Sequence, residues 1–158
     1  MRASDKIAEA GDALLRIAAL PQPRVFTNGV FDLLHRGHVA YLESARNLGA
    51  SLVVAVNSDA SVRRLVKGRE RPLNLLEDRM AVLAALASVD LVVAFDTDTP
   101  RELIVAAMPE ILAKGGDYTA ATTAGAAEVT AAGGRFVAIP CVHPRSTTSL
   151  VERIRKDG

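Results

Sequence analysis

The chain has 158 residues, of which 49% are hydrophobic and 23% are charged, and its net charge is +1. A chain of this length can form one domain that buries about 70% of its unfolded surface. The near-neutral charge gives no reason to expect binding to bulk nucleic acid or to a membrane surface. The single cysteine, Cys141, excludes an internal disulfide and fits a reducing compartment.

The sequence also lacks the patterns of secreted or membrane proteins. No apolar run approaches the roughly 20 residues that a membrane span requires. The first residues include Asp5, Glu9 and Asp12, which a signal peptide would not contain. We therefore expect a cytoplasmic protein.

The N-terminal residues show helical periodicity. Ile7, Leu14 and Ile17 recur at helical spacing before Pro21. We expect residues 1–22 to form an amphipathic helix packed on a single domain of residues 23–158. Within that domain, apolar runs predict strands at 24–29, 51–56, 90–95, 111–113 and 135–139. Helical patterns follow at about 37–48, 59–66, 75–87, 100–107, 125–132 and 148–156.

Alternating helices and strands predict an α/β fold. Five short apolar strands separated by helices indicate a parallel sheet that is covered on both faces. Right-handed crossovers favour a doubly wound, Rossmann-like, five-stranded parallel sheet. In such sheets ligands bind beyond the carboxyl ends of the strands, near the point where strand order reverses. The loops after the five strands are therefore the expected place for a functional site.

The run FTNGVFDLLHRGH at residues 26–38 is the most informative motif. A predicted strand ends at Gly29, and His35 and His38 follow where a helical pattern begins. Unpaired amides and the helix dipole favour an anion at such a helix start. Gly37 in the first turn costs up to about 1 kcal/mol relative to alanine, which is understandable if a ring or a phosphate approaches the backbone. The simpler alternative is that both histidines only cap or pack the helix end.

These residues resemble a known superfamily. GVFDLLHRGH, together with the distant cluster RSTTS at residues 145–149, is similar to the H-x-G-H nucleotidyltransferases, which include glycerol-3-phosphate cytidylyltransferase and phosphopantetheine adenylyltransferase. With VAVNSD and LAKGGDY added, the pattern resembles the heptose 1-phosphate adenylyltransferases of this superfamily. The resemblance covers residues 24–156 and implies a nucleotidyltransferase fold.

The resemblance implies a reaction in which a sugar 1-phosphate attacks the α-phosphorus of ATP and pyrophosphate leaves. The product would be ADP-heptose, a precursor of the lipopolysaccharide core. A phosphate monoester has a second pKa of about 6, so the nucleophile is already largely a dianion and needs no general base. The expected cofactor is Mg²⁺, carried mainly by ATP, and no protein metal site is expected. The chain resembles the stand-alone form of the enzyme, for which a separate sugar kinase would supply the substrate, and a homodimer is possible.

Residue roles follow from the motif positions. His38 would donate a hydrogen bond to the α-phosphate and His35 would hold the neighbouring phosphates. Val30, Phe31 and Gly37 would contact the nucleotide through their backbone. The β- and γ-phosphates would be held by hydroxyls that could otherwise simply cap the last helix, namely those of Ser146, Thr147 and Thr148.

Four further side chains are candidates for substrate binding, with Asp117 expected at sugar hydroxyls or the nucleoside. Lys67 lies in a basic loop that could equally be a solvated surface, and Lys114 and Asp117 lie in KGGDY. Arg79 could bind a phosphate or form a structural ion pair. Cys141 and His143 lack further ligands at the spacing of a metal site.

Two other functions stay open at this point. One is a cytidylyltransferase that acts on glycerol 3-phosphate or a related phospho-alcohol. The other is a non-catalytic nucleotide-binding module, although such a module would be expected to lose a histidine or the STT cluster, and this chain has both.

Overall fold

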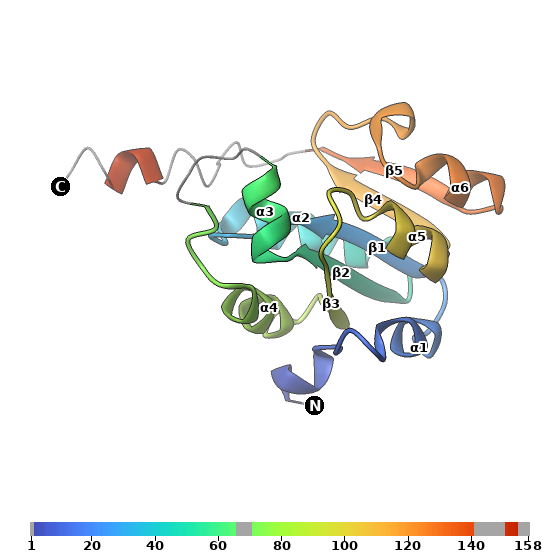
Figure 1. The fold of residues 1–158 in the computed structure, drawn as a ribbon. Coiled ribbons are helices and arrows are strands. Elements are labelled where there is room, and N and C mark those ends of the chain that lie inside the picture. The colour runs from blue at the N-terminus through green and yellow to red at the C-terminus, as the bar shows by residue number, and fades with distance from the viewer. Residues whose placement is uncertain (1, 66–70, 141–150, 155–158) are drawn as a thin grey trace.

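Five parallel strands form the centre of the computed structural model, which describes residues 2–65, 71–140 and 151–154 (Figure 1). The strand order is β3-β2-β1-β4-β5. The strands are β1 (Arg24–Gly29), β2 (Ser51–Asn57), β3 (Leu91–Phe95), β4 (Ile111–Gly115) and β5 (Arg135–Ile139). The expected doubly wound, five-stranded parallel sheet is therefore confirmed, with strand boundaries within two residues of those predicted.

Helices connect the strands and cover both faces of the sheet. The α-helices are α1 (Ala13–Ala18), α2 (Arg36–Arg46), α3 (Asp59–Arg64), α4 (Leu76–Ala84), α5 (Arg101–Ala107) and α6 (Ala126–Ala131). Two 3-10 helices, η1 (Ala3–Lys6) and η2 (Ala120–Thr122), are also present. Residues 151–154 are helical, which agrees with part of the predicted helix at 148–156.

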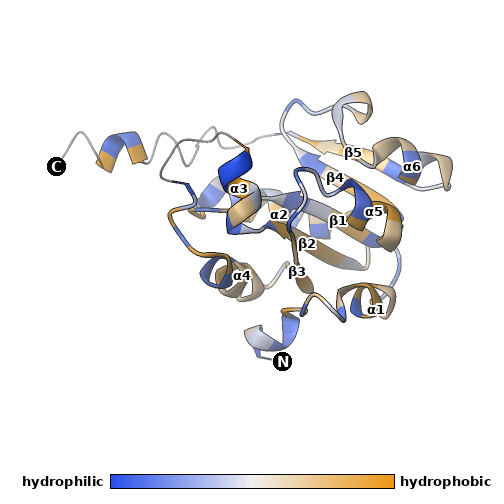
Figure 2. Cartoon of the chain, viewed as in Figure 1, coloured by the Kyte–Doolittle hydropathy of each residue, from blue (hydrophilic) through white to orange (hydrophobic). Residues whose placement is uncertain are grey.

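The apolar core consists of two layers, one on each face of the sheet. One layer joins α2 and α4 to the strands through residues such as Leu42 and Leu83, which are fully buried. The other layer joins α1, α5 and α6 to the opposite face through Ile17, Ile104 and Val129. All seven residues of β2 are buried, as expected for a central parallel strand. In Figure 2 the strands are coloured mainly as hydrophobic, whereas α3 carries strongly hydrophilic residues.

The N-terminal helix predicted within residues 1–22 is wrong in extent. The chain instead forms η1, and Ile7 then pairs in parallel with Val92 of β3. The backbone N–H of Ala8 donates to the Val92 carbonyl at 2.9 Å, and α1 begins only at Ala13. Since β3 is an edge strand, its unpaired backbone groups offer these residues hydrogen bonds that compete with helix formation.

The strand order reverses direction between β1 and β4. The chain passes from β1 outward to β2 and β3, and then returns to the other side of β1 for β4 and β5. The carboxyl ends of β1 and β4 therefore form the switch point at which ligands bind in doubly wound sheets. The turn after β1 leads directly from this point into α2.

Candidate functional site

The start of helix α2 is organised by the two histidines of the motif. His35 is the N-cap residue, and its Nδ1 accepts a hydrogen bond from the backbone N–H of Gly37 at 3.1 Å. The backbone N–H of His35 donates to Nδ1 of His38 at 3.4 Å. The two imidazole rings lie stacked, with 3.9 Å between their centres and 24° between their planes. The structure thus brings the predicted catalytic pair together.

These hydrogen bonds assign the tautomer of both rings. A neutral imidazole has one donor nitrogen and one acceptor nitrogen. Because Nδ1 accepts a hydrogen bond in His35 and in His38, the proton of each ring lies on Nε2. Each ring can therefore donate one N–H to an incoming phosphate oxygen.

The electrostatic environment keeps His38 neutral. Burial, together with the neighbouring His35, lowers the pKa of His38 from 6.5 to about 4. At neutral pH His38 is therefore a hydrogen-bond donor and not a cation. This matches the role predicted for it, which is to donate to a phosphate oxygen as charge develops there.

Helix capping and the predicted nucleotide site share the Gly37 amide. Its N–H is the donor in the His35 cap, so a nucleotide phosphate at Gly37 would have to share or displace that bond. The N–H groups of His38 and Val39 both donate to the His35 carbonyl, at 2.9 and 3.3 Å.

Phe31 links the turn after β1 to His38. Its ring meets the His38 ring edge-on, with 5.4 Å between centres. Its backbone is left-handed (φ 50°), which costs a residue with a side chain roughly 1–2 kcal/mol. A Cβ atom at Gly29 would lie 3.0 Å from the Phe31 ring, so a larger residue there would require the ring to shift. The family resemblance predicts that Phe31 contacts the nucleotide, but neither its left-handed backbone nor its contact with His38 could be inferred from the sequence.

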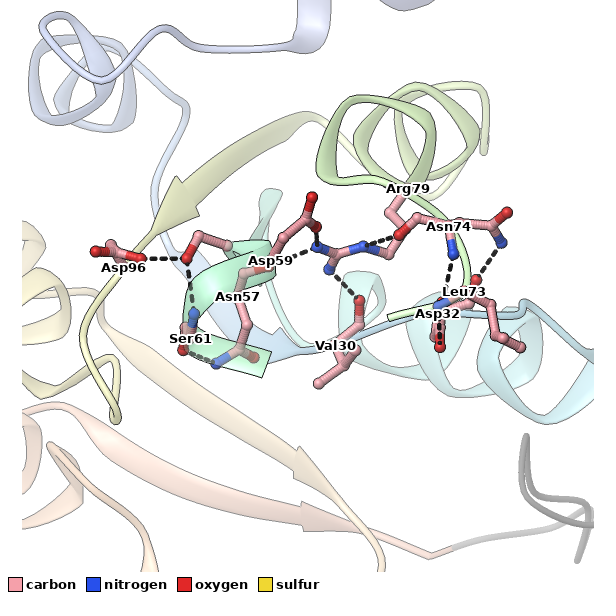
Figure 3. Close-up of polar contacts among 10 residues, drawn as sticks. Val30, Asp32, Asn57, Asp59, Ser61, Leu73, Asn74, Arg79 and Asp96 are labelled. Carbon is pink, nitrogen blue, oxygen red and sulfur yellow. Dashed lines mark hydrogen bonds and ion pairs between the residues drawn. The ribbon is translucent and has the colours of Figure 1, made fainter. Parts of the chain in front are cut away.

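Arg79 is buried and hydrogen-bonded to backbone from three segments (Figure 3). Its guanidinium donates to the carbonyls of Asn74 at 3.0 Å, Val30 at 2.7 Å and Asn57 at 2.9 Å. It also forms an ion pair with Asp59 at 2.7 Å. With no exposed side-chain surface, Arg79 fits the structural alternative better than the role of a phosphate ligand. A nucleotide at Val30 would share that carbonyl with Arg79.

Asp32 anchors the loop that precedes α4. Its carboxylate accepts hydrogen bonds from the backbone N–H groups of Leu73 and Asn74, both at 2.9 Å (Figure 3). It also accepts a hydrogen bond from the guanidinium of Arg71 at 2.8 Å. Burial would raise the pKa of Asp32, but the bonds from Asn74, Leu73 and Arg71 outweigh it, so the pKa is lowered. Sequence reasoning could not find these bonds, since their partners lie about 40 residues away along the chain.

Lys114 joins the two strand ends at the switch point. Its Nζ donates to the Asn28 carbonyl at the end of β1, at 3.1 Å. The same ammonium lies 5.1 Å from the centre of the Tyr118 ring, within the range of a cation–π contact. Asp117, the other predicted residue of KGGDY, is exposed. Lys114 therefore lies at the predicted site, whereas nothing in the contacts of Asp117 indicates a role.

Tyr41 fixes α2 against both strands of the switch point. Its hydroxyl bonds to the hydroxyl of Thr27 in β1 and donates to the carbonyl of Ala113 in β4, the latter at 3.2 Å. Burial raises the pKa of Tyr41 to about 12. A Cβ atom at Gly115 would lie 3.1 Å from the Tyr41 ring, so this glycine allows close packing of α2 against β4.

Several predicted residues lie outside the part of the chain that the structure describes. These are Lys67, Ser146, Thr147 and Thr148, together with Cys141 and His143. Within residues 2–65, 71–140 and 151–154, no group of three or more His, Cys, Asp or Glu side chains could hold a metal ion. The same ranges contain no helix long and apolar enough to cross a membrane.

A groove of about 690 Å³ lies beyond the carboxyl end of β3. It is lined by the end of α3, the loop after β3 and the start of α5, including Arg64, Thr97 and Arg101. None of the predicted site residues lines it. The chemistry of the histidine pair and the switch point, and not this groove, therefore defines the candidate site.

Comparison with known proteins gives matches along most of the chain. A cytidylyltransferase-like family model matches residues 26–152. A D-beta-D-heptose 1-phosphate adenylyltransferase of Bordetella bronchiseptica is 55% identical over 98% of this chain and 97% of its own length. The bifunctional protein HldE of Citrobacter koseri is 56% identical over 85% of this chain, which corresponds to 28% of that protein.

Solved structures agree with the fold. A lipopolysaccharide core biosynthesis protein from Thermoplasma volcanium is 26% identical, with a TM-score of 0.63 over 77% of this chain and 98% of its own. A pantothenate synthetase from Thermus thermophilus, at 20% identity, shares the fold with a TM-score of 0.66 over 99% of this chain and 70% of its own. With the family model covering most of the sequence, this chain belongs to the cytidylyltransferase-like family.

Proposed function

We propose that this chain transfers AMP from ATP to D-glycero-β-D-manno-heptose 1-phosphate, giving ADP-heptose and pyrophosphate for lipopolysaccharide core biosynthesis. The observation that carries the proposal is the match, over almost the full length of both chains, to a protein named as a heptose 1-phosphate adenylyltransferase. The histidine pair at the start of α2 supplies the matching chemistry.

The reaction requires positioning and charge stabilisation more than proton transfer. The sugar phosphate is largely a dianion at neutral pH, so it attacks the α-phosphorus without a general base. The bond from the α-phosphorus to the pyrophosphate oxygen breaks as the new P–O bond forms. A neutral His38 with its proton on Nε2 is suited to donate to an α-phosphate oxygen in the transition state, and His35 to a neighbouring phosphate.

Further groups take part in the proposed reaction. Lys114, at the end of β1 and β4, would offset negative charge on the substrates. Mg²⁺ would enter bound to the phosphates of ATP. The β- and γ-phosphates would be held by side chains outside the described residues, namely Ser146, Thr147 and Thr148, with Lys67 toward the sugar phosphate. A cytoplasmic location, a homodimeric assembly and supply of the substrate by a separate sugar kinase belong to the same proposal.

The test is pyrophosphate release from MgATP with the heptose 1-phosphate, with MgCTP and glycerol 3-phosphate in parallel reactions. Release with ATP and the heptose, lost in a folded His38→Ala variant, is the expected result. Release only with CTP would instead support the cytidylyltransferase alternative. Nucleotide binding without release from either pair would support a non-catalytic module.

A further inference from the structure

The turn after β1, formed by residues 30–32, is held on both sides of Phe31. On one side the Val30 carbonyl accepts a hydrogen bond from Arg79 at 2.7 Å. On the other side the Asp32 carboxylate accepts hydrogen bonds from the backbone of Leu73 and Asn74. All of these donors come from residues 71–79, the loop before α4 and its first turn (Figure 3).

Additional bonds connect the two sides of this arrangement. The side-chain amide of Asn74 donates to the Asp32 carbonyl at 2.6 Å, and the Asn74 carbonyl accepts from Arg79 at 3.0 Å. Arg79 also donates to the Asn57 carbonyl at the end of β2. A guanidinium has a planar fork of five donors, so it can join three backbone segments in a way that the single ammonium of lysine cannot.

The residue between these two attachment points is the one that touches His38. Phe31 has a left-handed backbone, a conformation that persists only where its surroundings enforce it. Its ring packs edge-on against His38, and Gly29 leaves room for that ring. Whatever holds the backbone on each side of Phe31 therefore also sets where its ring meets His38.

We propose that Asp32 and Arg79 are positioning residues for AMP transfer, which hold the 30–32 turn so that Phe31 keeps the His38 ring in its phosphate-binding orientation. They act without touching the substrate. The proposal deepens the proposed function, because it names residues that support the same site. The orientation of the His38 ring can be tested without turnover.

The chain offers a matched pair of variants for this test. Asp32→Asn removes a carboxylate near the carboxyl end of β1. This carboxylate accepts hydrogen bonds from two backbone N–H groups and from Arg71. Glu110→Gln removes a carboxylate at the amino end of β1, where it accepts bonds from the backbone and side chain of Arg24. Both changes break a partly buried ion pair at one end of β1, but only Asp32 belongs to the turn.

Two readouts are measured on both variants. The first is kcat and KM for ATP, where Asp32→Asn is expected to lower kcat by about 10- to 100-fold with a smaller change in KM. The second is the histidine ring signal in ¹H–¹³C NMR, which three histidines make simple to assign. In Asp32→Asn the His38 signal is expected to shift and its titration midpoint to move up from about 4. Glu110→Gln is expected to leave kcat and the His38 signal as in the wild type.

Arg79→Lys tests the other side of the turn and is expected to behave like Asp32→Asn. If Asp32→Asn does not fold, Arg71→Gln removes just one of the bonds to the same carboxylate and is expected to cause smaller changes in the same direction.

A folded variant with wild-type kcat and a wild-type His38 signal would overturn the proposal. A lower kcat with an unchanged His38 signal would overturn it as well, since the effect would not pass through that ring. If the wild type transfers no AMP, the proposed function fails, and the NMR comparison still decides whether Asp32 positions His38.

Discussion

The backbone N–H of His35 donates to Nδ1 of His38, while Nδ1 of His35 accepts from the helix start. Each ring is thereby fixed by the same short stretch of backbone, and the two rings stack on one another. Because Nδ1 of each ring is an acceptor, Nε2 is the donor nitrogen of each ring. Helix capping and the proposed phosphate recognition therefore involve the same two residues, and substitutions can separate the two roles.

The low pKa of His38 predicts how stability depends on pH. The folded pKa is about 4 and the ordinary value is 6.5. Above pH 6.5 the ring is neutral in both states, whereas between these values the unfolded chain binds a proton that the folded chain does not. Stability therefore falls as pH drops from 6.5 toward 4. After allowance for solvent screening, the loss due to His38 is about 2 kcal/mol.

Urea unfolding of the wild type and of His38→Gln, near pH 7 and near pH 4.5, checks this expectation. The wild type should lose more unfolding free energy than the variant over this interval, since the other titrating groups are common to both. Equal losses would show that the folded protein does not depress the pKa of His38.

His35 allows capping to be separated from catalysis. Asparagine is a good N-cap residue, so His35→Asn is expected to keep the stability of α2 but to lose the Nε2 donor and about 10²-fold in kcat. His35→Ala should lose that activity and also about 1 kcal/mol of unfolding free energy. Urea unfolding and steady-state kinetics on both variants measure the two effects. Full activity in His35→Asn would show that His35 caps α2 but takes no part in catalysis.

Lys114 is expected to act through its charge at the switch point. Lys114→Met should lower kcat/KM about 10²-fold, because the variant loses the ammonium that we propose to offset charge on the substrate phosphates. Lys6→Met is the matched control, since Lys6 also donates to a backbone carbonyl, that of Leu86, at 3.0 Å. The control should keep wild-type kinetics. If the two variants show the same kcat/KM, Lys114 has a structural role alone.

The sequence predicted those features of the fold that depend on local pattern. Each strand is a short apolar run, and the helices between them dictate a parallel sheet, so fold class and strand boundaries could be found without the structure. The N-terminal helix was predicted too long because Ile7 pairs with Val92, far away in the sequence. Helical spacing alone cannot reveal such a competing partner.

The same distinction applies to the site. The spacing of His35 and His38 and the glycine between them were visible in the sequence as a local motif. The bond from Arg79 to Val30 spans 49 residues, and the bond from Asp32 to Leu73 spans 41. An arginine in a helix and an aspartate in a turn have many possible partners, so only the folded arrangement shows that both hold the 30–32 turn.

Tyr41 provides a last prediction, on the attachment of α2 to the sheet. Tyr41→Phe removes the hydroxyl that bonds to Thr27 and to the Ala113 carbonyl. Because both partners are buried, the expected loss is about 1–2 kcal/mol of unfolding free energy at neutral pH.

The pKa of Tyr41 is about 12 and the ordinary value is 10. Between these values the unfolded chain loses a proton that the folded chain keeps, so the wild type loses stability as pH rises and the variant lacks this contribution.

Urea unfolding of both proteins near pH 8 and near pH 11 measures the two effects together. The variant should be less stable near pH 8, and the difference between the proteins should narrow near pH 11, where ionisation in the unfolded state costs the wild type part of its advantage. A constant difference would mean that Tyr41 ionises as readily in the folded protein as in the unfolded chain. That result would contradict the arrangement in which the Tyr41 hydroxyl is buried and attaches α2, the helix that contains His38, to β1 and β4.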